Sequence, residues 1–191
     1  MALFIVCLVI FLGLHSVSIV APAWRDAQAA RLGEGLWKGL YSVASIISLV
    51  LMIYGYGLAR HSPVVLYTPP DALRHLALLL MLPVFPLFIA AYFPGRIKSL
   101  TKHPMLLSVQ LWALAHLLAN GTLNDVLLFG AFLAWGVIDH ISVKHRAGVR
   151  PVPGAPAGPL NDVIVVVAGL ALYVFILLWA HLRVVGVSPL S

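Results

Sequence analysis

Residues Thr101–Gly121 read TKHPMLLSVQLWALAHLLANG, an apolar run that can cross a lipid bilayer and yet contains two histidines. Similar apolar runs recur along the chain, which is 62% hydrophobic and only 9% charged over 191 residues and has a mean hydropathy of +1.02. An average soluble domain is nearly half apolar and about a quarter charged. The composition therefore predicts an integral membrane protein.

Six runs of the sequence are candidates to cross the hydrocarbon core, which is roughly 30 Å thick and takes about 17 to 25 helical residues. They are Ala2–Val20, Gly39–Ala59, Leu73–Phe93, Met105–Ala119 with its flanks, Leu123–Ile141 and Val163–Arg183. The sequence thus predicts an all-α, polytopic membrane bundle of about six transmembrane helices, forming a single domain over residues 1–191. The first run lacks a basic leader and a small-residue cleavage site, so we expect it to be retained.

Most basic residues fall in the connections on the side that the chain reaches after the first run. These are Arg25, Arg31, Lys38, Arg96, Lys98, Lys102, Lys144, Arg146 and Arg150. Because basic residues collect in cytoplasmic loops, this side is expected to be cytoplasmic and both termini periplasmic. The same topology accounts for the formal net charge of +6 without a nucleic-acid partner.

Three local features predict breaks and caps in the helices. Pro83 and Pro86 fall inside the third run and predict a bend, because proline removes a backbone donor. Residues 148–161, GVRPVPGAPAGPLN, are rich in proline and glycine and predict a linker. Asn161 or Asp162 is then expected to cap the last helix.

Two of the eight histidines, His15 and His116, lie deep inside apolar runs. An imidazole in hydrocarbon needs a hydrogen bond or a metal. Helical spacing places Phe11 on the face of His15, and Trp112 and Asn120 on the face of His116. A haem held by one imidazole from each of two helices fits these apolar, aromatic faces. Alternatively, each histidine only hydrogen-bonds a neighbouring helix. The rise of 1.5 Å per residue also predicts a difference in depth of up to about 10 Å between the two histidines.

Further polar residues near the predicted helix ends are candidates to bind the haem propionates. Carboxylates at a membrane surface need hydrogen-bond donors. His75, His140, Arg74 and Lys102 meet this requirement by residue type and position.

The string KHPMLLSVQLWALAHLLANG, including Trp112, His116, Asn120 and Gly121, resembles the signature of the NnrU family of bacterial membrane proteins. LGLHS near the start and VIDHISVKHR after the fifth run resemble other landmarks of that family, which is similar to 15-cis-zeta-carotene isomerases. The resemblance implies a six-helix protein of the bacterial inner membrane. In the isomerase branch it implies a haem b with axial histidines at the positions of His15 and His116. That branch also carries a cysteine where this chain has Ala113.

Four functions follow from these observations and the resemblance. The first is a haem b protein acting in denitrification or nitric oxide metabolism, by redox chemistry, by binding nitric oxide or by handling haem. The second is a haem-dependent cis/trans isomerase of a polyene, against which Ala113 counts. The third is an S-adenosylmethionine-dependent methyltransferase of the isoprenylcysteine type, since such proteins share the His103-Pro104 pair. The fourth is a membrane scaffold without catalysis. The sequence leaves open whether the protein is an enzyme. The expected partners are membrane lipid, haem and a small gas or polyene, and protein partners are undefined.

Overall fold

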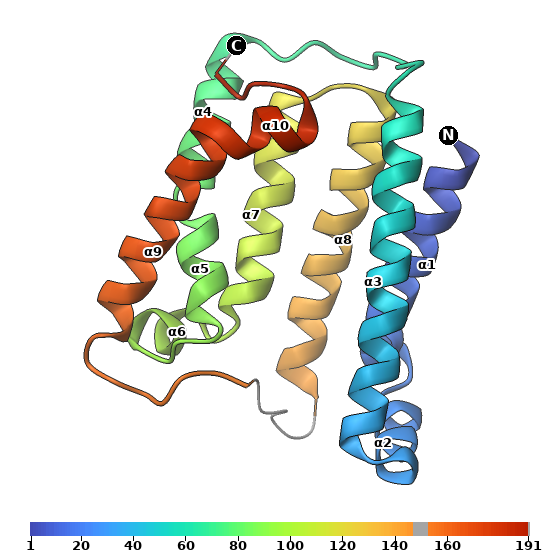
Figure 1. Ribbon diagram of the computed structural model, residues 1–191, viewed down its shortest axis with the longest axis vertical. Coiled ribbons are helices and arrows are strands. Elements are labelled where there is room, and N and C mark those ends of the chain that lie inside the picture. The colour runs from blue at the N-terminus through green and yellow to red at the C-terminus, as the bar shows by residue number, and fades with distance from the viewer. Residues whose placement is uncertain (147–152, 191) are drawn as a thin grey trace. The chain divides into compact units, whose positions relative to one another are not determined.

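The computed structural model describes residues 1–146 and 153–190, and helices form its regular elements (Figure 1). In chain order these are α1 (Ala2–Val20), α2 (Pro22–Leu32), α3 (Glu34–Ala59), α4 (Asp71–Met81), α5 (Val84–Ala90), α6 (Arg96–Thr101), α7 (Pro104–Ala119), α8 (Leu123–His145), α9 (Asn161–Phe175), the π-helix η1 (Ile176–Ala180) and α10 (His181–Val185). Arg150 and the first part of the predicted linker lie outside the described residues.

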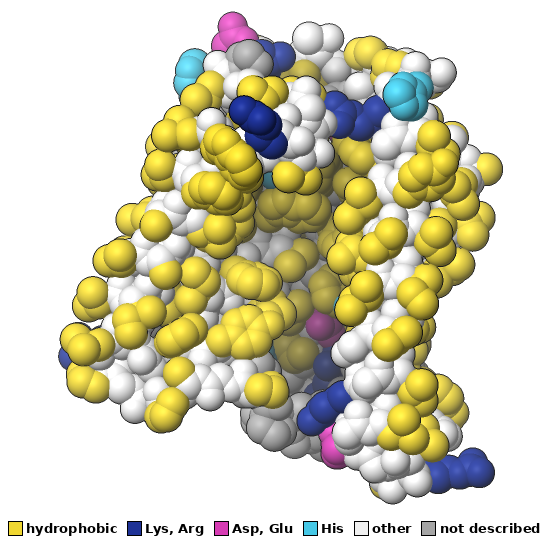
Figure 2. All heavy atoms as spheres, viewed as in Figure 1, with side chains coloured by type: hydrophobic (Ala, Val, Ile, Leu, Met, Phe, Trp, Pro, Cys, Tyr) yellow, Lys and Arg dark blue, Asp and Glu magenta, His cyan; other side chains and the backbone are white. Residues whose placement is uncertain are grey.

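Five helical segments are long and apolar enough to cross a membrane, which confirms the all-α helical membrane bundle. They are Ala2–Val20, Glu34–Ala59, Asp71–Ala90, Leu123–His145 and Asn161–Val185. Only 11 to 22% of each segment's most apolar window is buried inside the protein, so most of these side chains are left for lipid. Figure 2 shows hydrophobic side chains covering the helices. The remaining predicted run forms α7, whose 16 residues rise about 24 Å.

Backbone contacts group the chain into two compact units, while a single domain over 1–191 stays a prediction. Unit 1 comprises Met1–Thr68 and Asn120–His145, and unit 2 comprises Pro69–Ala119 and Arg146–Ser191. Unit 1 thus contains α1, α2, α3 and α8. Unit 2 contains the remaining helices.

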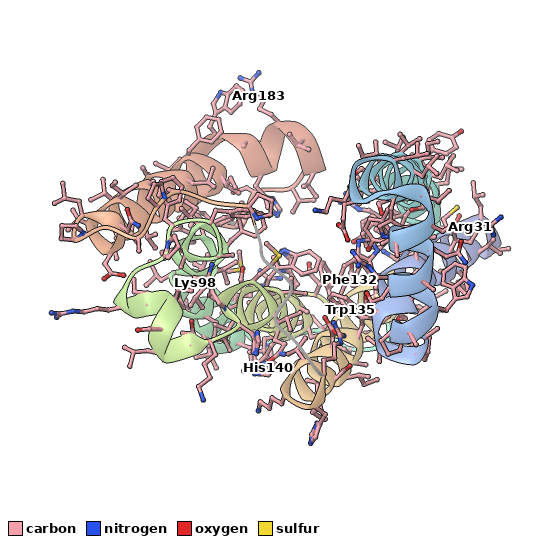
Figure 3. All side chains as sticks on the ribbon, turned by 90° about the horizontal axis from the view of Figure 1, so that it is seen from below. Arg31, Lys98, Phe132, Trp135, His140 and Arg183 are labelled. Atoms are coloured by element: carbon pink, nitrogen blue, oxygen red, sulfur yellow. The ribbon has the colours of Figure 1, made fainter. Side chains whose placement is uncertain are left out.

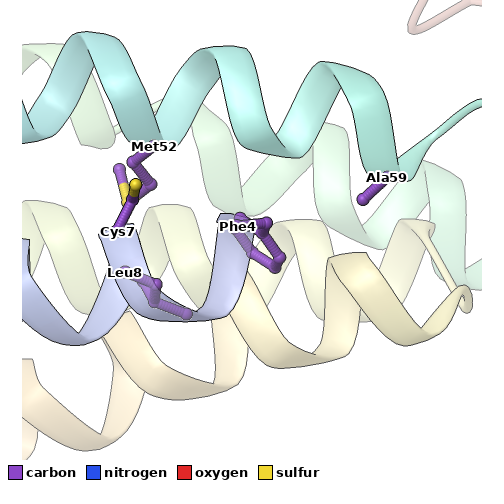
Figure 4. Packing of buried hydrophobic residues seen from close by; sticks show 5 residues of the cluster. All are labelled: Phe4, Cys7, Leu8, Met52 and Ala59. Atoms are coloured by element: carbon purple, nitrogen blue, oxygen red, sulfur yellow. The ribbon is translucent and has the colours of Figure 1, made fainter. Parts of the chain in front are cut away.

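The core of unit 1 forms where α1 packs against α3. Phe4, Cys7 and Leu8 from α1 meet Met52 and Ala59 from α3 (Figure 4). Gly55 lies at the closest approach of the two backbones, because a Cβ there would stand 2.9 Å from Cα of Phe4. Small residues allow such close contact between membrane helices.

Helix α2 is polar and follows α1 after a single residue, Ala21. Pro22 begins it, a position where proline's missing N–H costs no helical bond. The helix that contains the second predicted run is also longer than that run, since α3 begins at Glu34 and not at Gly39. The apolar residues of the short helix α2 are mostly alanines interspersed with charged residues, so a search for long apolar runs does not find it.

A compact joint connects the end of α3 to the start of α8 within unit 1. The backbone N–H groups of Leu66 and Tyr67 donate to the carbonyl oxygen of Gly121 at 2.8 and 3.1 Å, and Leu123 N–H donates to Val64 at 2.8 Å. The phenol of Tyr67 donates to the main-chain oxygen of Asn120 at 2.7 Å. A Cβ on Gly121 would fall 1.9 Å from the carbonyl oxygen of Tyr67, so this position requires glycine.

In unit 2, the predicted bend appears as a break between α4 and α5 at Leu82 and Pro83. Pro86 follows on α5 and contacts α9, where a Cβ on Gly169 would lie 2.4 Å from the backbone nitrogen of Pro86. The hydroxyl of Ser108 on α7 donates to the carbonyl oxygen of Val84 at 2.8 Å. The prolines thus shape a helix that packs closely on both neighbours.

The prediction that Asn161 or Asp162 caps α9 is wrong, because that helix has no side-chain cap. The Asp162 carboxylate instead accepts hydrogen bonds from the backbone N–H groups of Arg96 and Ile97, at 2.8 and 3.0 Å. Asn161 donates to the carbonyl oxygens of Pro94 and Pro156, at 2.7 and 2.9 Å. Both side chains therefore bind other segments of unit 2, where unpaired backbone groups needed partners.

Candidate functional site

His15 lies on α1 with its ring half-buried and its orientation fixed by the helix itself. Its Nδ1 is 2.7 Å from the carbonyl oxygen of Phe11, one turn earlier. Because a carbonyl only accepts, Nδ1 carries the proton and donates it. In the neutral ring, Nε2 then holds the lone pair with which histidine binds metals.

Aromatic rings from three helices of unit 1 surround His15. The Phe11 ring lies 4.2 Å away, centroid to centroid, and is tilted by 32°. Tyr41 of α3 lies at 5.6 Å and Trp135 of α8 at 6.1 Å, both edge-on. The Phe132 ring of α8 lies 5.7 Å from the Phe11 ring, and Figure 3 labels both Phe132 and Trp135 on α8. We call the rings of Phe11, Tyr41, Phe132 and Trp135 the aromatic wall. The structure therefore brings Phe11 to His15, as expected.

Sequence reasoning missed the parts of this wall that come from other helices. Tyr41, Phe132 and Trp135 lie far from His15 in the sequence, and helical spacing relates only residues on one helix. A tryptophan three residues after a phenylalanine in an apolar run was the available signal. It could not indicate which helix the pair would face.

Trp135 has an unmatched hydrogen-bond donor. Its Nε1 is buried, and no group among the described residues accepts a hydrogen bond from it. Native proteins pair more than about 90% of their buried polar groups. A buried indole donor beside His15 is therefore a feature that needs an explanation.

His116, on α7 in unit 2, repeats the local arrangement of His15. Its Nδ1 is 2.8 Å from the carbonyl oxygen of Trp112, again one turn earlier. The Trp112 ring lies 5.2 Å from the imidazole, tilted by 50°. The donated Nδ1 proton leaves the lone pair on Nε2 here as well. On the same helix, Ala113 is fully buried.

The remaining predicted site residues lie in varied surroundings. Arg74 and His75 are exposed on α4, and Arg74 lies 3.8 Å from Asp71. Lys102 is exposed in the turn before α7, at a positive φ of 59°. His140 is half-buried on α8, and Figure 3 shows it on another side of that helix from Trp135. The main chain of Asn120 forms part of the joint before α8. Their role toward a cofactor stays a prediction.

Within residues 1–146 and 153–190, no group of three or more His, Cys, Asp or Glu side chains gathers as a metal site. Haem ligation needs no such group, because the porphyrin itself supplies the equatorial nitrogens. The relevant donors are single imidazoles with the lone pair on Nε2, and both His15 and His116 provide one. The residues present thus fit a haem by the chemistry of their donors.

These helices and their aromatic-flanked histidines define a polytopic α-helical membrane protein. Residues 3–189 match the family described as NnrU protein. The match spans nearly the whole chain, which therefore belongs to the NnrU family. Comparison with curated proteins and with solved structures gave no match.

Proposed function

We propose that this protein binds haem b in the inner membrane of a bacterium, with His15 and His116 as axial ligands, and acts in denitrification or nitric oxide metabolism. The observation that carries the proposal is the shared geometry of the two histidines. In each, Nδ1 donates to the carbonyl oxygen of an aromatic residue one turn earlier, and that residue's ring packs beside the imidazole. The metabolic role rests on the resemblance to the NnrU family.

The residues around the histidines would each make a distinct contribution. Phe11 and Trp112 fix the two imidazoles through their carbonyl groups, and such outer partners orient a ligand and raise its basicity. Their rings pack beside the imidazoles and would offer a flat porphyrin apolar contacts. Bound haem would supply one-electron redox chemistry or, on release of one histidine, a binding position for nitric oxide.

The polyene isomerase is the less favoured function. The cysteine of the isomerase branch is replaced by Ala113, whose methyl group is fully buried, so no thiol is present at that position. A mechanism that exchanges cysteine and histidine therefore has no counterpart in this chain. The isomerase function is tested by feeding a cis-carotenoid to cells that contain the protein and to cells that lack it. A different cis/trans ratio in the cells that contain the protein would favour the isomerase.

The decisive experiment is spectroscopic. The protein is purified in detergent, supplied with haem b, and its absorption is recorded oxidised, reduced and exposed to nitric oxide. We expect a Soret band in the wild-type protein and an altered coordination spectrum in both His15→Ala and His116→Ala. His61→Ala and His145→Ala, which change exposed histidines, serve as controls and should match the wild-type protein. A wild-type protein that binds no haem would overturn the proposal.

A further inference from the structure

We infer that Trp135 donates its indole hydrogen bond to a peripheral carboxylate of the haem held at His15. This inference rests on the proposed function and adds a binding residue that the predicted set did not contain. It concerns unit 1 alone, because His15 and Trp135 both belong to that unit.

The first step is the unmatched donor. An indole N–H can donate a hydrogen bond and cannot accept one. When such a donor is buried without an acceptor, it loses the hydrogen bonds that water gave it and gains nothing in return. Nε1 of Trp135 is in this position among the described residues. A ligand that brings an acceptor would remove the penalty.

The second step is the location of the donor. The Trp135 ring stands nearly perpendicular to the His15 imidazole, at 88° and 6.1 Å. Of the other rings beside the imidazole, Phe11 has no acceptor, and the phenol of Tyr41 does not accept a hydrogen bond from the indole. Whatever His15 binds through Nε2 is therefore a direct candidate to meet the indole.

The third step is the chemistry of the ligand. Haem b is apolar apart from its iron and its two propionates, and a carboxylate in apolar surroundings needs donors. The propionates are therefore the groups of haem b that can accept the hydrogen bond of the Trp135 indole.

The test compares two iron porphyrins in three proteins. Haem b and etiohaem, which has no carboxylates, are titrated into the wild-type protein, Trp135→Phe and Trp24→Phe. Trp24 is 53% exposed, so its variant controls for the loss of an indole. We expect Trp135→Phe to bind haem b about 10- to 100-fold more weakly than the control, the range for a hydrogen bond to a charged group. With etiohaem the two variants should bind equally.

Three outcomes would overturn the inference, and two of them leave the proposed function intact. Equal binding of haem b by both variants would show that Trp135 donates no hydrogen bond to haem b. An equal loss by Trp135→Phe for both porphyrins assigns the residue to packing only. A wild-type protein that binds neither porphyrin overturns the proposed function itself, and the inference with it.

If the Trp135→Phe protein does not fold, a measurement on the wild-type protein tests the inference in its place. Ultraviolet resonance Raman spectra of the wild-type protein report hydrogen bonding of indole N–H groups. Haem b should shift the indole band toward a stronger hydrogen bond, and etiohaem should not. The same shift with both porphyrins, or with neither, contradicts the inference.

Discussion

The phenol of Tyr56 on α3 donates a hydrogen bond to the carboxylate of Asp125, which is 7% exposed in the first turn of α8. The hydroxyl of Thr122 donates to the second oxygen of the same carboxylate. The Thr-x-x-Asp spacing resembles a capping box, with the acid also bound to another helix. The side-chain amide of Asn124 donates to this carboxylate as well, at 3.5 Å, so a buried acidic group in unit 1 fastens α3 to α8.

We expect Tyr56→Phe to lower the free energy of unfolding by about 1 to 3 kcal/mol, because the buried carboxylate loses a donor. The matched control is Tyr54→Phe, which removes a phenol that is 60% exposed on the same helix. Unfolding by dodecyl sulfate in mixed micelles, followed by circular dichroism, measures the difference. Equal stability of the two variants would show that the Tyr56 bond contributes nothing.

Two glycines of α3 are expected to respond oppositely to alanine. Gly55→Ala should destabilise the protein, since the new Cβ would stand 2.9 Å from backbone Cα of Phe4, whereas a Cβ on Gly57 meets nothing within 4 Å. Gly57→Ala should be neutral or stabilising by up to about 1 kcal/mol, the difference in helix propensity. The same micelle unfolding assay compares them. A Gly55→Ala protein as stable as Gly57→Ala would contradict the close crossing of α1 and α3.

Gly121→Ala tests whether the Asn-Gly pair of the family string has a structural role. The added Cβ would overlap the carbonyl oxygen of Tyr67, so we expect lower stability and loss of the joint before α8. Gly130→Ala on α8 has open space and serves as the control. Protease cleavage of residues 60–70 reports the joint directly. Unchanged protection of this segment in Gly121→Ala would refute the prediction.

The joint should also withstand alkaline pH. Partial burial raises the pKa of the Tyr67 phenol above its ordinary value of 10.0, and the Asp125 carboxylate raises it further. The bond to Asn120 needs the protonated phenol. Its contribution to stability is therefore complete below the unfolded-state pKa and is lost as the pH rises through the higher folded-state pKa. The titration of Tyr67 is obtained by subtracting the phenolate absorbance of the Tyr67→Phe protein from that of the wild-type protein. A midpoint at or below pH 10 would disprove the raised pKa of Tyr67.

If one iron takes both imidazoles, loss of either His15 or His116 weakens the binding of haem. We expect haem at 100 times its Kd to stabilise the wild-type protein by about 2.7 kcal/mol. His15→Ala and His116→Ala should each reduce the stabilisation by haem. The double variant should lose little more of this stabilisation than the single variant with the larger loss. Thermal unfolding with and without haem measures all four proteins. Strictly additive losses would instead indicate two separate sites.

The fold was largely accessible from the sequence, because hydropathy identifies membrane helices directly and Pro83 and Pro86 mark a break. The i, i+4 relation of Phe11 to His15, and of Trp112 to His116, was also accessible. The wall formed by Tyr41, Phe132 and Trp135 was not, since it depends on which helices become neighbours. The partner of Asp162 was predicted wrongly for a similar reason. Its carboxylate binds the first backbone N–H groups of α6, a tertiary neighbour, and does not cap its own helix α9.

The interleaved order of the two units has a consequence for biosynthesis. The chain passes from one unit to the other after Thr68, Ala119 and His145. The ribosome therefore makes α4 to α7 of the second unit before it makes α8, which brings Trp135 and Asp125 to the first unit. During synthesis, α1 and α3 therefore enter the membrane before α8 is available to pack against them. Any cofactor that contacts the rings of Phe132 and Trp135 can bind only after α8 has been inserted.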